Sequence, residues 1–249
     1  MGTRLKILLA VALVVIAAGG AGAYWYFRDD APPEVSLAAA TASVGSSTAS
    51  TPSTTGATGS AGGTGIEGTL VVDSATGDFD YESATGTFAG FRIQEELANI
   101  GSATAVGRTG DVTGTVQIDG TTVSSATFEI DLTTITTNES RRDDKVQEAL
   151  ETSRHPTATF ALAEPIELGP NAADGEALAV TAVGDLTIKG VTQRVEFPLE
   201  AQLVDDTVVV VGSLDLTFSD YGVEVPESQL VLSVEDHGIL ELQVLLVEG

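Results

Sequence analysis

Residues 126–132 alternate strictly between apolar and polar side chains, and this pattern constrains the fold more than any other stretch of the chain. Its apolar members share one side, while Thr127, Glu129 and Asp131 share the other. A period of two, with β-branched and aromatic members, predicts a strand with one buried and one solvent-exposed face. The apolar face of such a strand must be covered, so the rest of the chain has to supply the covering layer.

A short helix is expected soon after this strand, at residues 140–150. Ser140 followed by Asp143 matches the capping-box pattern, and Val146, Ala149 and Leu150 recur at helical spacing. We therefore predict a half-buried strand that leads into a capped helix of about three turns.

Strand signals dominate the chain from residue 66 to its end. An Asp-Gly turn at residues 119–120 between two alternating segments is typical of a hairpin, and residues 189–190, 205–206 and 237–238 are interpreted as further turns. Short antiparallel connections predict an all-β barrel or a β-sandwich, and a barrel has the advantage of leaving no exposed sheet edge. The strands are expected at residues 70–73, 79–82, 87–94, 112–118, 126–132, 157–163, 177–188, 193–203, 207–218, 230–234 and 239–247.

Residues 7–27 contain no charged side chain and are long enough to cross a bilayer as a helix. Arg4 and Lys6 precede this segment and Asp29 and Asp30 follow it, so the positive-inside rule predicts a cytoplasmic N-terminus. We expect residues 1–30 to form a single-pass anchor in the cytoplasmic membrane, with the rest of the chain extracytoplasmic. The alternative is a signal peptide cleaved near Ala23, which would release a secreted protein.

Residues 31–65 consist mainly of Ala, Ser, Thr, Gly and Pro, and are expected to form a flexible, disordered linker because they cannot bury enough apolar surface. Residues 63–68 match the dinucleotide-binding pattern G-x-G-x-x-G. No strand is expected before them and no helix after them, so no nucleotide cofactor is predicted. The folded domain is therefore placed at residues 66–249.

The composition excludes several functions. The chain has 36 Asp and Glu against 11 Lys and Arg, a net charge of −25, which argues against nucleic acid as a partner. It has no cysteine, and its two histidines, His155 and His237, lie far apart in the sequence, so no metal site is predicted. No serine-hydrolase motif is present, so no catalytic residue is assigned. The sequence leaves the oligomeric state open.

Five motifs occur together in a particular order. They are TGTFAGFRI at residues 85–93, TTNESRRD at 136–143, HPTATF at 155–160, GDLTIKGVT at 184–192 and DYGV at 220–223. In this order and spacing they resemble the YceI-like family of bacterial envelope proteins. The resemblance implies a lipocalin-like antiparallel barrel that holds a polyisoprenoid or another long-chain lipid in its lumen, without enzymatic activity.

Apolar side chains at alternate strand positions are the candidate lumen residues. From the pattern alone they predict either a filled core or a hollow barrel; a filled barrel would leave a scaffold or adhesion domain with an acidic surface. The resemblance favours the hollow barrel, whose apolar lumen would stabilise a bound lipid by about 0.8 kcal/mol per buried CH₂ group. The candidates are Phe88, Phe91, Phe128, Ile130, Leu132, Phe160, Leu162, Leu186, Ile188, Phe197, Leu214 and Leu216.

Two cationic residues complete the candidate ligand-binding set. Arg142 lies in the second motif, where it either meets the polar head of a ligand at the barrel mouth or pairs with a neighbouring carboxylate. Lys189 lies at a strand–strand connection in the fourth motif, where it is either a ligand contact or a turn residue.

Overall fold

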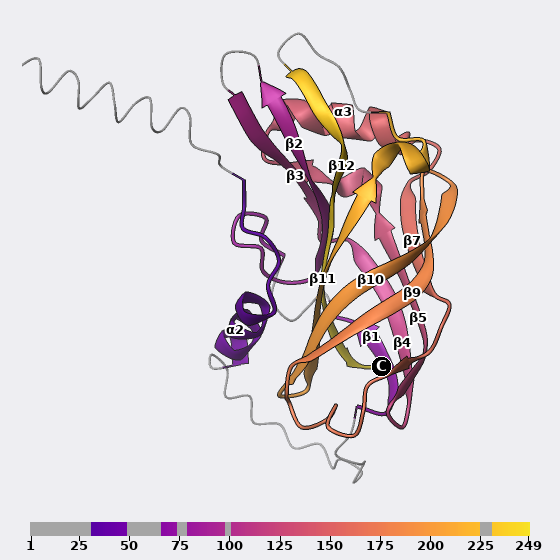
Figure 1. Cartoon of the computed structure of the whole chain (residues 1–249). Helices are drawn as coiled ribbons and strands as arrows, with labels where there is room; N and C mark the ends of the chain where they lie inside the picture. The colour runs from indigo at the N-terminus through magenta and orange to yellow at the C-terminus, as the bar shows by residue number, and fades with distance from the viewer. Residues whose placement is uncertain (1–30, 49–65, 74–78, 98–100, 225–230) are drawn as a thin grey trace, which may run out of the picture.

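An antiparallel barrel of eight strands is the main feature of the computed structural model, which describes residues 31–48, 66–73, 79–97, 101–224 and 231–249 (Figure 1). Strands β1, β4, β5, β7, β9, β10, β11 and β12 follow one another around the barrel, and β1 closes it by pairing with both β4 and β12. The elements are α2 (Leu37–Thr48), β1 (Gly68–Val72), β2 (Phe88–Leu97), β3 (Gly101–Thr109), β4 (Val112–Asp119), β5 (Thr122–Asp131), η1 (Leu132–Thr134), β6 (Thr136–Thr137), α3 (Ser140–Leu150), β7 (Thr157–Leu162), β8 (Ile166–Glu167), β9 (Leu178–Ile188), β10 (Val191–Val204), β11 (Thr207–Thr217), η2 (Phe218–Tyr221) and β12 (Val231–Glu248).

The longest strand, β12, has two neighbours along the same edge. Its C-terminal end pairs with β1, and the rest of that edge pairs with β2, which in turn pairs with β3. The β2–β3 hairpin therefore extends the wall beyond the point where β1 ends. Figure 1 shows α3 at the end of the barrel to which this hairpin extends, far from β1 and the C-terminus.

The structure confirms an antiparallel barrel and the strand and helix predicted from residues 126–150. The alternating segment lies in β5, and α3 begins at Ser140 and ends at Leu150. The predicted capping box is wrong, because Glu139 is the N-cap and makes no side-chain capping bond. The Asp143 carboxylate instead accepts hydrogen bonds from the amide and hydroxyl of Thr137, at 2.8 and 2.7 Å.

Three strand predictions differ from the structure. Strand β3 was not predicted, because its sequence, GSATAVGRT, has small side chains that give no clear alternation. Residues 230–234 and 239–247 were predicted as two strands joined by a turn, but residues 231–234 and 239–247 belong to the single strand β12. The pairing with β2 shifts register between Val234 and Gly238, so the predicted turn is a bulge within one continuous strand. Asp80 forms only an isolated bridge with Thr85, so residues 79–82 are not a regular strand.

Residues 31–48, which we call the N-terminal strap, differ from the flexible linker expected there. Helix α2 buries Leu37, Ala40 and Val44 against Val209 and Val211 of β11 and Leu245 of β12. These positions are spaced by three and four residues, so they form one apolar stripe on the helix. The strap is therefore packed on the outer wall of the barrel, as Figure 1 shows.

The expected membrane anchor at residues 7–27 and the remaining linker residues, 49–65, lie outside the described residues. Within the described part of the chain, no helix has both the length and the apolar character needed to cross a bilayer.

Candidate functional site

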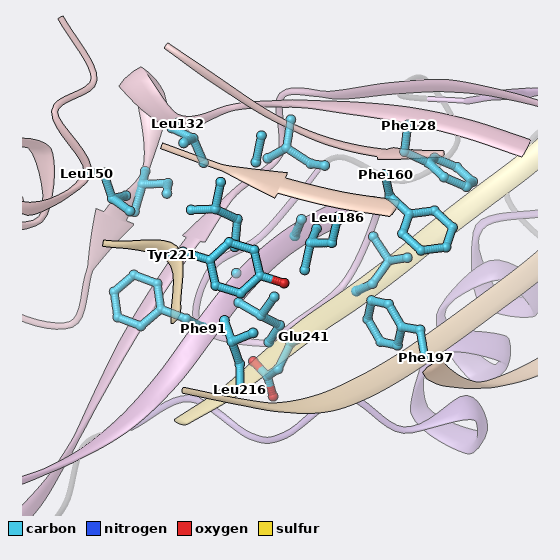
Figure 2. Close-up of a pocket in the computed structure, with 18 of the residues that line it drawn as sticks. Phe91, Phe128, Leu132, Leu150, Phe160, Leu186, Phe197, Leu216, Tyr221 and Glu241 are labelled. Carbon is cyan, nitrogen blue, oxygen red and sulfur yellow. The ribbon is translucent and has the colours of Figure 1, made fainter. Parts of the chain in front are cut away.

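An apolar cavity of about 120 Å³ occupies the barrel interior toward the α3 end. Side chains from several neighbouring strands line it, together with Leu150 of α3 and Tyr221 of η2 (Figure 2). Among the lining residues, Tyr221 and Glu241 are the two with ionisable side chains. The surface offered to a ligand is therefore almost entirely hydrocarbon.

A second apolar cavity, of about 110 Å³, adjoins the first and extends toward the end of the barrel where β1 closes it. Phe128, Phe160, Ala182, Leu199 and Leu242 line both cavities, so the two share a wall.

Glycines on neighbouring strands make room for the large rings of the lumen. A Cβ added to Gly107 would lie 2.6 Å from Phe91 Cζ, and one added to Gly184 would lie 2.6 Å from Phe160 Cε2. Each ring thus lies against the wall, in the space that a side chain at the glycine position would otherwise fill. The centre of the barrel is therefore more open. The same relation holds for Phe128 with Gly114 and for Phe197 with Gly212.

Most of the predicted lumen residues face these cavities. Two of their rings, Phe160 and Phe197, meet edge to face with centroids 6.3 Å apart, an arrangement that fixes their orientation. The predicted residues that line a cavity are Phe91, Phe128, Ile130, Leu132, Phe160, Leu162, Leu186, Ile188, Phe197 and Leu216.

Two predicted lumen residues lie elsewhere. Phe88 is fully buried outside the lumen, where its ring packs against Phe79 and under the Arg108 guanidinium, 4.6 Å from the ring centroid. Alternation explains this position, because residues 88 and 91 of one strand point to opposite faces. Leu214 packs against the core around the first cavity without lining either cavity.

The two cationic candidates have protein partners instead of facing the lumen. Arg142 makes an ion pair with the buried Glu95, at 2.6 Å, and donates to Asn138. Lys189 donates to the Gly222 carbonyl at 2.8 Å and pairs with Glu151 at 3.1 Å. Both contacts favour the structural interpretation of these residues, in which they connect α3 and the β9–β10 turn to the barrel.

Sequence reasoning missed several lining residues. Tyr221 lies in the DYGV motif, but that motif was used only to establish the resemblance. Ile135, Leu150 and Val223 also line the first cavity, and they lie between strands or on α3, where strand alternation gives no signal. The second cavity was not anticipated as a separate space.

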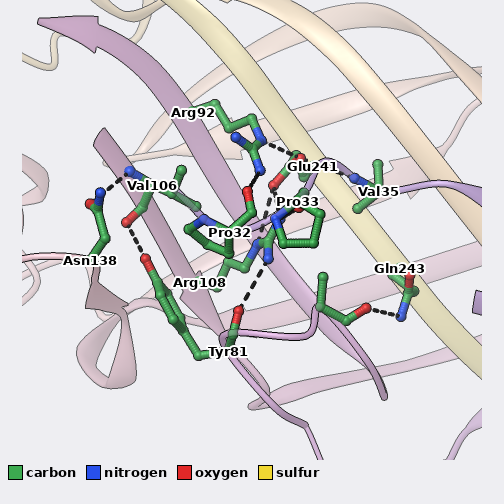
Figure 3. Close-up of polar contacts among 11 residues, drawn as sticks. Pro32, Pro33, Val35, Tyr81, Arg92, Val106, Arg108, Asn138, Glu241 and Gln243 are labelled. Carbon is green, nitrogen blue, oxygen red and sulfur yellow. Dashed lines mark hydrogen bonds and ion pairs between the residues drawn. The ribbon is translucent and has the colours of Figure 1, made fainter. Parts of the chain in front are cut away.

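A buried ionic cluster lies behind the first cavity, on the outer face of the barrel (Figure 3). The carboxylate of Glu241 accepts from Arg92 Nε at 2.7 Å and from Arg108 Nη2 at 2.8 Å, and all three residues are at most 7% exposed. The strap completes the cluster: the carbonyls of Pro32 and Pro33 accept from the two arginines, and the Val35 amide donates to Glu241.

Tyr81 lies at the edge of this cluster. Its hydroxyl donates to the Val106 carbonyl at 2.7 Å, and its own carbonyl accepts from Arg108. Burial raises the pKa of Tyr81 to about 12, although the nearby Arg108 charge opposes this shift. The cluster thus connects β2, β3 and β12 with the strap by ion-paired, hydrogen-bonded polar groups.

Comparison with known proteins identifies a matching family model and several similar solved structures. The model of the YceI-like domain matches residues 80–246. A polyisoprenoid-binding domain from Saccharophagus degradans, implicated in plant cell wall breakdown, is 15% identical, with a TM-score of 0.49 over 66% of this chain and 98% of its own. BcnA of Burkholderia cenocepacia is 20% identical, with a TM-score of 0.49 over 70% of this chain and 98% of its own. A search of curated proteins found no match.

The family match spans most of the chain, and the matched range covers β2 to β11 and nearly all of β12. All five motifs that carry the resemblance lie inside it. The chain therefore belongs to the YceI-like family.

Proposed function

We propose that this protein binds a polyisoprenoid or a similar long-chain amphiphile in the barrel lumen and is not an enzyme. The two adjoining cavities carry the proposal, because their walls are almost entirely hydrocarbon and a filled scaffold barrel would not contain them. Membership of the YceI-like family, a binding fold, supports the same function.

The dimensions of the cavities favour a slender chain. An apolar cavity of about 150 Å³ remains dry in water and accepts a benzene-sized molecule, so each of these cavities suits a short length of hydrocarbon. A chain that passes between Phe128 and Phe160 would occupy both cavities and gain about 0.8 kcal/mol for each buried CH₂ group. A fused-ring ligand would require a larger rearrangement of the wall.

We further propose that the protein is held at the outer face of the cytoplasmic membrane by residues 7–27. The absence of charge in this segment and the basic residues before it support an anchor. Cleavage near Ala23 would instead release the barrel, and the intact mass of the native protein distinguishes the two outcomes.

The lipid can be tested on the full chain purified from its native source. We expect denaturing extraction followed by mass spectrometry to recover about one long-chain lipid per protein molecule. A Phe160→Trp variant should retain at least about fivefold less lipid than wild type, because the larger ring enters both cavities at their shared wall.

Phe79→Trp provides the matched control, because Phe79 packs against Phe88 outside the lumen. It should retain the wild-type amount of lipid. Recovery of no stoichiometric lipid from the wild-type protein would refute the proposed function, and equal retention by the Phe160 variant would place the ligand elsewhere.

A further inference from the structure

Tyr221 stands apart from the other lining residues of the first cavity. It ends the short helix η2, and the next residue, Gly222, turns the chain with a φ of 66°. The side chain is 1% exposed, and Figure 2 shows the hydroxyl directed into the space between the apolar lining residues. The structure therefore places a polar atom inside an otherwise hydrocarbon cavity.

This hydroxyl has no hydrogen-bond partner among the described residues. The carboxylate of Glu241, the other ionisable lining residue, is already held by Arg92, Arg108 and the Val35 amide. A bridging water needs two to four polar partners, and the apolar walls supply too few. A buried hydroxyl without a partner is unfavourable, so a ligand that accepts its hydrogen bond gains affinity from this position.

The hydroxyl is suited to donate this bond. Burial raises the pKa of Tyr221, and the nearby Asp220 charge raises it further, so the phenol remains neutral at physiological pH. A neutral phenol donates to a carbonyl, hydroxyl or ether oxygen. None of the lining residues is cationic, so the cavity favours a neutral acceptor over an anionic head group.

We propose that Tyr221 is the polar recognition residue of the lumen, and that it selects long-chain lipids carrying a neutral oxygen acceptor over pure hydrocarbons of the same length. This inference rests on the proposed function and adds the chemical class of the ligand. It also assigns an orientation, because the oxygen of the bound lipid lies beside η2, in the first cavity, and the hydrocarbon extends toward the second.

The test compares farnesol with the hydrocarbon farnesene on the delipidated full chain in detergent. Displacement of a fluorescent prenyl probe gives the affinity of each. We expect wild type to prefer farnesol, and Tyr221→Phe to reduce that preference roughly fivefold to tenfold by lowering affinity for farnesol alone. Tyr81→Phe is the matched control, since its hydroxyl donates to a backbone carbonyl outside the lumen, and it should keep the wild-type preference.

A second measurement reports on the empty protein. Removing an unpaired buried hydroxyl should leave the thermal unfolding temperature of delipidated Tyr221→Phe equal to or above that of wild type. An unchanged preference for farnesol, or a lower unfolding temperature that reveals a protein partner for the hydroxyl, would overturn the assignment of Tyr221. Failure of wild type to bind either compound would instead reject the proposed function itself, and this assignment with it.

Discussion

Glu241→Gln tests whether the buried ionic cluster holds the strap on the barrel. The substitution keeps the size of the side chain and removes its charge. In the native structure one carboxylate makes ion pairs with two buried guanidinium groups, at 2.7 and 2.8 Å, and also accepts from the Val35 amide of the strap. Without that charge, Arg92 and Arg108 remain buried with only carbonyl acceptors.

Removing one partner of a buried ion pair costs about 3–5 kcal/mol. The glutamine carbonyl can still accept one of the hydrogen bonds that the carboxylate accepted, so we expect the free energy of unfolding to fall by about 3 kcal/mol. For a domain of this size, about 1 kcal/mol corresponds to a shift of roughly 2–4 °C, which predicts a decrease of about 6–12 °C in Tm.

Urea denaturation gives the free energy, and limited proteolysis reports separately on the strap. We expect cleavage within residues 31–48 to become faster than cleavage within the barrel. Glu248→Gln makes the same chemical change at an exposed position of the same strand and should alter stability by less than about 0.5 kcal/mol. A Glu241 variant as stable as the Glu248 control, with an equally protected strap, would refute this account of the cluster.

Two further predictions concern the lumen wall and the edge of the cluster. Gly107→Ala should force the Phe91 ring toward the first cavity, which would reduce the amount of lipid recovered by extraction and lower the free energy of unfolding by about 1–3 kcal/mol. Gly45→Ala is the control: no atom lies within 4 Å of the added Cβ, so this variant should retain the wild-type amount of lipid. Because folding raises the pKa of Tyr81 from 10.0 to about 12, its contribution to stability should be constant below pH 10 and fall between pH 10 and 12, where the unfolded chain ionises first. Urea denaturation of Tyr81→Phe should show a smaller decrease over this range, and an identical decrease would contradict the assigned pKa.

Strand alternation predicted the lumen well where large apolar residues occupy one face. Phe128 and Ile130 of β5, and Leu186 and Ile188 of β9, are spaced by two residues and line the first cavity as expected. The same rule separates Phe88 from Phe91, so the error at Phe88 came from selecting residues by type without following their alternation. Tyr221 lies in a 3₁₀ turn, and its environment depends on strands distant in sequence.

The strap was missed because its composition is typical of linkers and only three of its side chains form the buried stripe. The barrel itself contains a signal for it. Residues 208–211 of β11 are four consecutive valines, and a strand that is apolar on both faces must be covered on both. That signal predicts a cover over the outer face of β11 without identifying which segment supplies it.

If residues 7–27 form the proposed anchor, the strap would also limit how far the barrel can move from the lipid surface. Pro32 is fixed to Arg92, so only residues 28–31 separate the proposed anchor from a firm attachment to the wall, a distance of at most about 18 Å. The long Ser- and Gly-rich stretch at residues 49–65 follows α2, and therefore gives the barrel no additional reach. With residues 7–27 in the bilayer, the protein would remain beside the membrane, so a lipid could pass from bilayer to lumen without crossing a wide layer of water.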